Sequence, residues 1–398
     1  MNQARANDAG LEQLQKRALL VGGGALALCL VGWLTNPTQF FYSYLLGYLL
    51  WVGVALGSAS LLMIQHLAGG DWGFVIRRCL EAGLRTVRVL FVLILPLMLG
   101  LRELYIWARP EIVNADIILQ HKAAYLNIPF FLARTAIYFI IWGLFAHFLS
   151  KLSVEQDRTG DPSIQRRLEM ISGPGLAVMG LTVTFSAVDW VMSLDPHWFS
   201  TLFGFVFIVG NVLTALALMI CTLAFLRHRE PLASLLKPSH FHDLGNLMMA
   251  FVVLWAYMAL SQYLIIWSGN LPEEITWYID RTGTGWVVVA LLLVAFHFAV
   301  PFLVLLSRRT KLIVPNLVKV AAFLLLMRLL DLLWTVAPVL HHEEFHVSWM
   351  DVAAPVGIGG IWLAFFIRGL LEHPLLPLKD PRRAALEDAA LEHAGGHH

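Results

Sequence analysis

The chain has 398 residues, of which 58% are hydrophobic and only 14% charged, and its mean hydropathy is +0.70. About a quarter of the residues in a soluble protein are charged, so this composition excludes an ordinary soluble protein and indicates one whose solvent is the lipid bilayer. The 28 Lys and Arg nearly balance the 27 Asp and Glu, which leaves no net positive field for binding nucleic acid. The 3 cysteines stand apart in the sequence. They offer no disulfide framework, no paired-cysteine zinc site and no haem or iron–sulfur attachment motif.

Ten segments are long and apolar enough to span the hydrocarbon core of a bilayer, which is roughly 30 Å thick and takes about 20 residues of helix. In chain order they cover residues 17–34, 41–67, 84–101, 127–150, 170–194, 199–226, 244–267, 285–307, 312–337 and 349–371. We therefore predict an all-α integral membrane protein with ten transmembrane helices.

The connections between these segments alternate in charge. Of the 28 Lys and Arg, 21 fall on one side. Only Arg102, Arg109, Lys122 and Arg281 fall on the other side, whose loops are instead rich in acids and histidines. Because an excess of Lys and Arg marks cytoplasmic loops, we predict that both termini are cytoplasmic.

Two parts of the chain share their residue spacings, which indicates an internal repeat. The shared spacings are six residues between Gly47 and Gly53 and between Gly204 and Gly210, and seven residues between Asp189 and Pro196 and between Asp331 and Pro338. They predict two tandem four-helix bundles, made of the second to fifth and the sixth to ninth helices, flanked by the first and tenth helices. The predicted parts are a cytoplasmic N-terminus with the first helix (1–40), the two bundles (41–198 and 199–340), an outer loop with the tenth helix (341–378), and a cytoplasmic tail (379–398).

Ionisable side chains within the ninth segment are the first candidates for function, since a charge at a helix centre costs about 2.5 to 3.5 kcal/mol on insertion scales. Arg328 and Asp331 are three residues apart and share a helix face. Lys319 lies nine residues before Arg328, roughly 13 Å nearer the cytoplasm. Two interpretations stay open. One is a structural ion pair, and the other is a proton relay in which Asp331 exchanges protons beside the fixed Arg328 charge and Lys319 continues the path inward.

Asp189 is the second candidate, because Thr182 and Ser186 precede it and give the fifth segment a polar seam. No basic residue is near it in sequence. Its carboxylate is therefore expected either to bond neighbouring hydroxyls for helix packing or to cycle between protonated and ionised forms. Further out, Asp195 and His197 supply the carboxylate and imidazole that a quinol needs in order to lose its two hydroxyl protons.

Histidines within the apolar segments have two interpretations each. His297 lies four residues before Pro301, which frees a backbone carbonyl, so the imidazole either bonds such a carbonyl or takes part in a relay. His66 and His147 lie near the cytoplasmic ends of the second and fourth segments, either as snorkelling side chains or as a haem-ligating pair. Arg134 is expected to snorkel outward or to pair with an outer-loop acid.

The outer half of the seventh segment is polar. It contains Tyr257, Gln262 and Tyr263, which belong either to the interfacial aromatic belt of a membrane protein or to a pocket for a quinone or a lipid. With Asp189 and His197, these three are the candidate quinone-binding residues.

Two stretches of the chain carry a family resemblance. They are MSLDPHWFSTLFG at 192–204 and SQYLIIWSGNLPEEITWY at 261–278. With the ten-helix layout, they resemble the ActF-type membrane subunit of alternative complex III, in the family of NrfD-like, polysulfide-reductase-type membrane anchors. The resemblance extends over essentially the whole chain.

The resemblance implies a multi-pass subunit of a bacterial inner-membrane complex that oxidises quinol and passes electrons to a periplasmic carrier such as a cytochrome c. Its implied partners are c-type haem and iron–sulfur subunits on the periplasmic side, a related NrfD-like membrane subunit, and lipids. Haems and iron–sulfur clusters would lie in those partners. This chain would bind no cofactor covalently, with a quinone as its candidate ligand.

Within such a complex the chain would not be catalytic alone, because the better-supported quinol site of the family belongs to the related membrane subunit. It would provide a scaffold and a proton path. The family's functional positions correspond here to Asp189, Asp195, His197, Arg328 and Asp331, and the predicted path also includes Lys319 and His297.

An autonomous secondary transporter, or another proton-conducting membrane protein, is the alternative. A transporter needs discontinuous helices around a site at the membrane midplane. Gly173, Pro174 and Gly175, near the start of the fifth segment, are the only interruption of that kind in the sequence.

Overall fold

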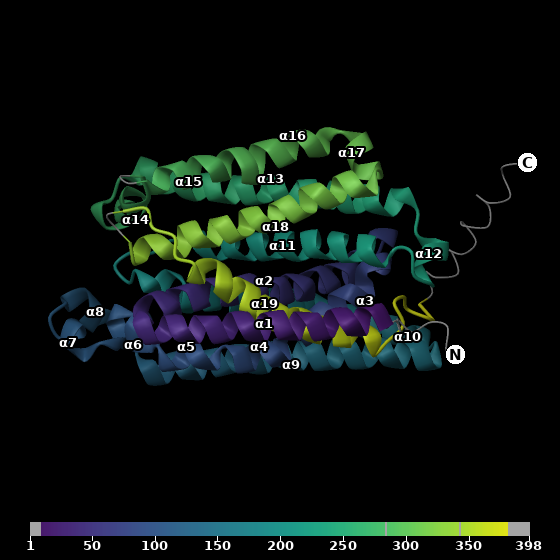
Figure 1. Cartoon of the computed structure of the whole chain (residues 1–398), viewed down its shortest axis with the longest axis horizontal. Helices are drawn as coiled ribbons and strands as arrows, with labels where there is room; N and C mark the ends of the chain where they lie inside the picture. Colours follow the sequence, from purple (N-terminus) through teal and green to yellow (C-terminus); the bar gives the residue numbers. More distant parts are fainter. Residues whose placement is uncertain (1–8, 283–284, 342–343, 381–398) are drawn as a thin grey trace, which may run out of the picture.

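The computed structural model describes residues 9–282, 285–341 and 344–380. Within these residues the regular structure is helical, and ten helices are long and apolar enough to cross a membrane. The long helices run side by side along one direction (Figure 1). The predicted all-α fold with ten membrane-spanning helices is confirmed, and the chain is a multi-pass membrane protein.

Two of the ten spans, the third and the eighth, are built from three consecutive helical segments each, and the fifth and ninth each continue into a short 3-10 helix, η2 (Met192–Leu194) and η4 (Ala337–Val339). The spans are α1 (Ala9–Thr35), α2 (Pro37–Ala68), α3 (Asp71–Arg85) with α4 (Val87–Leu93) and α5 (Leu95–Leu99), α9 (Ile128–Thr159), α10 (Pro162–Trp190), α11 (Phe203–Leu226), α13 (Pro238–Gly269), α15 (Trp286–Leu292) with η3 (Leu293–Ala299) and α16 (Val300–Leu306), α18 (Val314–Val336), and α19 (Met350–Leu371). The short connecting helices are α6 (Leu101–Leu104), η1 (Ile106–Ala108), α7 (Pro110–Val113), α8 (Ile117–Lys122), η2 (Met192–Leu194), α12 (Leu232–Leu235), α14 (Pro272–Thr282), α17 (Arg308–Leu312) and η4 (Ala337–Val339).

Several spans begin with the same local pattern, a side-chain cap followed by proline in the first turn. Asn36, Asn127 and Asp161 each accept a hydrogen bond from a backbone N–H in the first turn of α2, α9 and α10. Proline fits there because its missing N–H has no partner inside the helix. At the opposite end, α9 stops at Gly160, whose φ of +70° suits glycine.

The third span begins well before the predicted segment. The sequence predicts 84–101, whereas the helix begins at Asp71. Arg77, Arg78 and Glu81 make the first half of this span look like a charged loop. In the structure they are buried and paired with one another, so their charges are compensated inside the protein.

Eight of the ten spans form two groups of four, and within each group the helices contact one another in a closed ring. We call these groups the first ring and the second ring. In the first ring, α2 packs against α3 and α10, and α9 packs against α3, α4 and α10. In the second ring, α11 packs against α13 and α18, while η3 contacts both α13 and α18. The rings meet where α2 and α10 pack against α11, and where α2 packs against α18.

The first and last spans, α1 and α19, pack against each other and cover the first ring, where α19 contacts α2 and α3. Glycines allow this close approach. A Cβ atom at Gly22 of α1 would lie 2.8 Å from the backbone nitrogen of Ile361, and one at Gly360 of α19 would lie 2.5 Å from the carbonyl oxygen of Ala18. Small residues at such contacts are typical of membrane helices, whose association depends on close packing.

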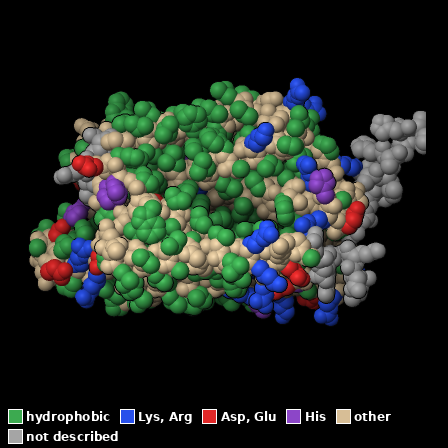
Figure 2. Space-filling model, viewed as in Figure 1, with side chains coloured by type: hydrophobic (Ala, Val, Ile, Leu, Met, Phe, Trp, Pro, Cys, Tyr) green, Lys and Arg blue, Asp and Glu red, His purple; other side chains and the backbone are tan. Residues whose placement is uncertain are grey.

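The surface of the molecule separates apolar sides from charged ends. Hydrophobic side chains cover most of the length between the two ends (Figure 2). Lys and Arg side chains gather mainly at the end that carries α12 and α17, opposite the end that carries α8 and α14 (Figures 1 and 2). We call the end with α8 and α14 the outer end, and the other the basic end.

Candidate functional site

A buried arginine–carboxylate pair joins α9 and α10 near the outer end. Arg134 of α9 donates from Nε and Nη2 to the two carboxylate oxygens of Asp189 on α10, both at 2.9 Å. The Tyr138 hydroxyl donates to the same carboxylate at 2.6 Å. Asp189 is fully buried. The two parallel N–H donors form a bidentate pair, the strongest geometry for an arginine and a carboxylate.

This pair corrects two expectations. Asp189 was expected to have no basic partner, either as an unpaired carboxylate or as one bonded to neighbouring hydroxyls, but it is bound by an arginine that lies 55 residues away in the sequence. Arg134 neither snorkels outward nor pairs with a loop acid. It is held between the rings of Tyr125 and Phe130, with its guanidinium carbon 3.8 and 4.3 Å from the ring centroids, and it also donates to the Tyr125 carbonyl oxygen.

A second buried pair lies in the other ring of helices. Arg328 Nη1 donates to Asp331 Oδ2 at 2.5 Å, and both side chains are buried on one face of α18. Arg328 Nη2 also donates to Asn211 Oδ1 of α11 at 3.1 Å. The predicted shared face is therefore present, and it is linked to a neighbouring helix that the sequence did not identify. Whether the carboxylate exchanges protons stays a prediction.

Two glycines of the predicted repeat make room for this group. A Cβ atom at Gly210 of α11 would lie 2.3 Å from Arg328 Nη1, and one at Gly53 of α2 would lie 2.5 Å from Asn211 Oδ1. A real Cβ atom at either position would displace a polar group of the cluster. The second buried pair therefore depends on glycine at 53 and 210.

His297 lies close to this second pair, in a π-helical stretch of the eighth span. The stretch, η3, precedes Pro301, and π-helical turns are rare and frequent at functional sites. The imidazole is fully buried and lies against the Trp255 ring, with centroids 4.0 Å apart. Among the described residues neither ring nitrogen has a hydrogen-bond partner, so the expected bond to a freed carbonyl is not formed. A relay role for His297 stays a prediction.

Lys319 is not brought to the second pair. It is exposed on α18, whereas Arg328 is buried. Nine residues are about two and a half helical turns, so positions 319 and 328 lie on opposite faces of the helix. The predicted inward continuation of the path through Lys319 is therefore not supported by the geometry.

At the outer end, His197 pairs with an acid from another loop. His197 Nε2 lies 2.6 Å from Asp116 Oδ2. This hydrogen bond is the main reason that the pKa of Asp116 is lowered from its ordinary value of 3.8. Asp195 is half-buried beside Lys122, which donates to the Pro196 carbonyl oxygen at 2.6 Å. Partial burial lowers the pKa of Lys122, and the Asp195 charge opposes that shift.

The candidate quinone-binding residues do not form one pocket. Gln262 is buried and contacts Ser200 and the Tyr278 hydroxyl. Tyr257 and Tyr263 are exposed on the surface of α13, at 62% and 40% of their full accessibility. Neither tyrosine shares a described contact with Asp189 or His197, so the structure does not bring the five predicted residues together.

An aromatic cluster with a buried arginine lies beside Gln262 and was not predicted. The Trp277 ring of α14 stacks on Trp198 at 4.9 Å and meets Trp334 of α18 edge-on at 5.0 Å. The Arg281 guanidinium lies 3.8 Å from the Trp277 ring and donates to the carbonyl oxygens of Trp334 and Thr335. A cation at the C-terminal end of a helix is favoured by the helix dipole, so Arg281 stabilises the outer end of α18.

A second group that the sequence did not identify lies at the basic end of the first ring. Arg77 of α3 contacts Glu81 at 3.1 Å and Asp380 at 2.7 Å, and Arg78 contacts Glu81 at 2.6 Å and also pairs with Asp157 of α9. These charges fix the chain after α19 to α3 and α9. The sequence signal for the group is the spacing of Arg77, Arg78 and Glu81 by three and four residues, which lie before the predicted third segment of 84–101.

The two histidines considered for haem ligation differ in environment. His66 is buried and its Nδ1 lies 3.0 Å from the Ser172 hydroxyl, whereas His147 is exposed on α9. In the described parts of the chain, no group of three or more His, Cys, Asp or Glu is placed to hold a metal ion.

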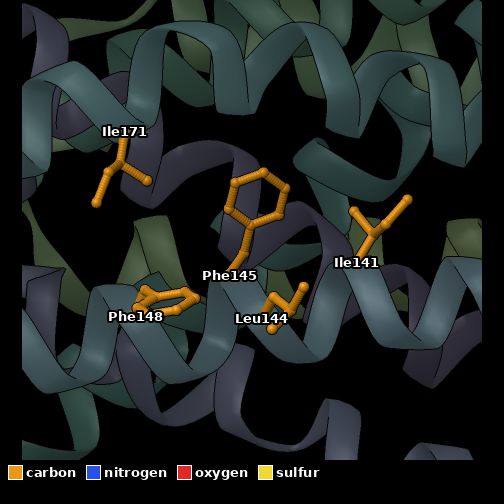
Figure 3. Close-up of a pocket in the computed structure, with 5 residues that line it drawn as sticks. All are labelled: Ile141, Leu144, Phe145, Phe148 and Ile171. Carbon is orange, nitrogen blue, oxygen red and sulfur yellow. The ribbon is translucent and has the colours of Figure 1, made fainter.

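An apolar cavity lies between α9 and α10. It has a volume of about 420 Å³ and is lined by Ile141, Leu144, Phe145, Phe148 and Ile171, which Figure 3 shows around it. Every lining side chain is apolar, so the cavity offers no hydrogen bond to a polar head group.

No protein-family model and no curated protein sequence matches this chain. The functional assignment therefore depends on the residues and on their geometry.

Proposed function

We propose that this chain is a membrane subunit of a bacterial quinol-oxidising electron-transfer complex, of the ActF type, and that it supplies a scaffold and a proton path without being catalytic alone. The observation that carries the proposal is that each ring of helices contains a buried arginine–aspartate pair away from its basic end, Arg134–Asp189 in the first ring and Arg328–Asp331 in the second. Ionisable side chains inside a membrane protein are costly, and they commonly mark ion or proton pathways.

The same proposal includes the arrangement of the chain. We assign the two rings of helices to two tandem four-helix bundles related by an internal repeat. Helix contacts correspond between the rings: α2 packs on α3 and α10, as α11 packs on α13 and α18, and α10 contacts α11 as α18 contacts α2. The excess of Lys and Arg at the basic end supports a cytoplasmic position for that end and for both termini.

The proposed proton path passes one arginine–aspartate pair in each bundle, Arg134–Asp189 in the first and Arg328–Asp331 in the second. In the second bundle, Asp331 exchanges the proton beside Arg328, with His297 nearby as a second protonatable group. In the first bundle, Asp189 lies near the outer end, where its carboxylate accepts a hydrogen bond from the Tyr138 hydroxyl. From there the path would leave through the outer loop that holds Asp195 and His197. Lys319 is not part of this revised path.

The outer end is the proposed docking surface for the redox partners, which are c-type haem and iron–sulfur subunits. A related NrfD-like membrane subunit would lie beside the chain in the bilayer. Support comes from exposed aromatic side chains at this end, Trp267, Phe345 and Trp349, each at least half accessible. Exposed aromatic residues are enriched in protein interfaces.

Purification from native membranes tests the assignment to a complex. We expect a tagged copy of the chain to retain c-type haem and iron–sulfur proteins in fixed stoichiometry, measured by haem absorbance and by mass spectrometry. A chain that is purified in folded form without haem proteins, under conditions that preserve other respiratory complexes, would contradict the proposal.

Replacement of the two acids tests the proton path. Asp331→Asn and Asp189→Asn keep an acceptor for each arginine but remove proton exchange. In proteoliposomes that contain the whole complex, we expect quinol oxidation to continue while proton uptake per electron falls. Lys319→Gln is the matched control, since it removes a charge from the exposed face of the same helix as Asp331. If both Asn variants take up protons as the wild type does, the acids are structural and the chain is a scaffold.

An autonomous secondary transporter remains the second candidate, but it has less support. Its only sequence signal was the Gly173–Pro174–Gly175 interruption. In the structure, α10 continues through Pro174 as one helix from Pro162 to Trp190, so this segment does not form the broken helix that such a site requires.

A further inference from the structure

A polar cavity lies at the basic end, between the last turn of α2 and the first two turns of α10. Its volume is about 290 Å³, and its lining consists of residues 66–69 of α2, Gln165 and Glu169 of α10, and Asp380. The side chains of His66 and Asp380 are buried, whereas Gln165 and Glu169 are half-buried. The accessible polar side chains of this cavity are therefore those of α10.

The polar cavity offers acceptors for a cation. Among the described residues Glu169 forms no ion pair, and its carboxylate accepts a hydrogen bond from the Gln165 amide at 2.9 Å. The other carboxylate, Asp380, is neutralised by Arg77. Carbonyl groups at the C-terminal end of a helix carry a partial negative charge and lack partners inside the helix, and α2 ends at Ala68, beside the cavity. A compact cation with several N–H donors therefore complements this lining.

An apolar cleft lies further into the membrane, where the two rings of helices meet. Its volume is about 210 Å³, and its lining comes from α2, α10, α11 and α13. Apart from Ser60 and Asn211, the lining residues are apolar or glycine. Leu254 at its edge is 36% exposed, so the cleft opens to the lipid-facing surface. This lining suits a hydrocarbon chain.

The polar cavity and the apolar cleft lie on the same face of each helix. Gly57 in the cleft and Ala68 in the polar cavity are eleven residues apart on α2, as are Gly180 and Glu169 on α10. Eleven residues are about three helical turns, or roughly 16 Å along the axis, so each helix presents both cavities on one side. Between them on α10, a Cβ atom at Gly173 would meet nothing within 4 Å. The two cavities are therefore the ends of one groove.

We infer that this groove binds one phospholipid whose head group carries a primary ammonium, as in phosphatidylethanolamine. The ammonium donates to Glu169 and to the last carbonyl groups of α2, and one acyl chain runs past Gly173 into the apolar cleft. The separation of the two cavities, roughly 16 Å, agrees with half of the hydrocarbon core, about 15 Å. Exposed Arg166 and Arg167 precede Glu169 on α10 and supply positive charge for the phosphate. The inference goes beyond the proposed function and does not rest on it.

The two cavities together select the class of ligand. A metal ion or a small amine would occupy the polar cavity alone, whereas a lipid occupies both. Among phospholipids, the charge of Glu169 selects the head group. An anionic head group such as that of phosphatidylglycerol is repelled by the carboxylate, and a choline head group has no N–H to donate in a charge-assisted hydrogen bond.

Photocrosslinking of the full chain tests the inference. The chain is placed in nanodiscs of phosphatidylcholine, and the probes are phosphatidylethanolamine and phosphatidylglycerol that each carry a diazirine in one acyl chain. Crosslinks are mapped by mass spectrometry. We expect the phosphatidylethanolamine probe to label the cleft, within 176–183, 208–212 or 251–254, more strongly than the phosphatidylglycerol probe, and unlabelled phosphatidylethanolamine to displace it.

Replacement of the acid tests the head-group contact. Glu169→Gln keeps the size of the side chain and removes its charge. Labelling of the cleft by the phosphatidylethanolamine probe should fall about three- to tenfold, as expected for the loss of one charge-assisted hydrogen bond that is partly exposed. Glu155→Gln is the matched control, because it removes the same charge at the same end from α9, outside the cavity.

A variant that fills the cleft tests the acyl chain independently of the head group. A Cβ atom at Gly180 would meet nothing within 4 Å, so Gly180→Leu extends into the cleft without a backbone clash and should abolish labelling of the cleft. Gly143→Leu is the matched control, because position 143 is equally open but lies outside the cleft.

Three outcomes overturn the inference. They are equal labelling of the wild type by the two probes, equal labelling of Glu169→Gln and Glu155→Gln by the phosphatidylethanolamine probe, and unchanged labelling of the cleft in Gly180→Leu. The assay uses the chain without partners, so its result is independent of the copurification test of the proposed function.

Discussion

Removal of one partner from the Arg134–Asp189 pair should destabilise the protein far more than removal of both. Arg134→Met keeps a long apolar side chain but removes both N–H donors from a fully buried carboxylate, which then retains only the Tyr138 hydroxyl of the donors described above. Breaking a buried ion pair from one side costs about 3 to 5 kcal/mol. Loss of the cation contact with the Tyr125 ring adds about 0.5 to 2 kcal/mol.

The double variant Arg134→Met/Asp189→Leu removes both charges, so no uncompensated ion stays buried. Replacement of a whole buried pair by apolar residues of similar volume is often neutral or stabilising. We therefore expect the double variant to recover most of the stability that the single variant loses.

The assay is unfolding in mixed micelles with increasing dodecyl sulfate, followed by far-ultraviolet circular dichroism. Arg368→Met is the matched control, because Arg368 of α19 forms an exposed pair with Glu372, the residue after the helix, at 65% and 49% accessibility. Such a pair contributes about 0.3 to 0.5 kcal/mol. The reasoning is refuted if Arg134→Met costs no more than Arg368→Met, or if the double variant is as unstable as the single one.

Three further changes have expected outcomes. Lys319→Gln should leave both the unfolding midpoint and proton uptake per electron unchanged, because the side chain is exposed and far from the Arg328 face of α18; a loss of coupling would restore this residue to the path. Gly53→Ala should destabilise by about 1 to 3 kcal/mol through overpacking, while Gly143→Ala, which meets open space, should be neutral or slightly stabilising in the same dodecyl sulfate titration. If the two alanine variants changed the stability equally, the close approach at Gly53 would not contribute to the stability of the protein. The Asp116–His197 contact should weaken in acid, because the pKa of Asp116 is lowered in the folded state. The stability that the ionised Asp116 contributes is present above its ordinary pKa of 3.8, and it is lost as the pH falls through the lower pKa of the folded state. The ratio of pepsin cleavage of the loop 105–127 in the wild type to that in Asp116→Asn, in which the pH dependence of pepsin itself cancels, should then increase with acidity below about pH 4; a constant ratio would show that the contact does not hold the loop.

The ten spans were predictable from the sequence because the bilayer imposes a length and a composition on each helix separately. The Arg328–Asp331 pair was predictable for a related reason. Its two residues are three apart on one helix, so geometry within a single turn brings them together. Both predictions use information that is local in the chain.

Partners from different helices were not predictable in the same way. Arg134 and Asp189 are 55 residues apart, and Asn211 and Arg328 are 117 apart. No periodicity within one segment specifies which face of α9 meets which face of α10. The buried charges of α3 show the same limit, since Arg77 and Arg78 look like loop residues until the acids of α9 and of the segment after α19 are placed beside them.

The expected continuation of the path through Lys319 used the distance between Lys319 and Arg328 along the helix axis but not the angle between them around the axis. Two and a half turns place the two side chains on opposite faces, and the exposed position of Lys319 agrees with this. A proton path along one face of a helix requires residues that are separated by about a whole number of turns. The spacing of residues 328 and 331 is close to one turn, whereas the spacing of residues 319 and 328 is about two and a half turns.

Asn211 is the residue at which the contact between the two rings of helices and the second ion pair meet. Glycine at position 53 lets the Asn211 oxygen approach α2, and glycine at 210 lets Arg328 reach it. A Cβ atom at either position would displace the Asn211 oxygen or the Arg328 guanidinium. The packing of the two rings of helices and the Arg328–Asp331 pair therefore depend on the same amide group, which accepts from Arg328 at 3.1 Å.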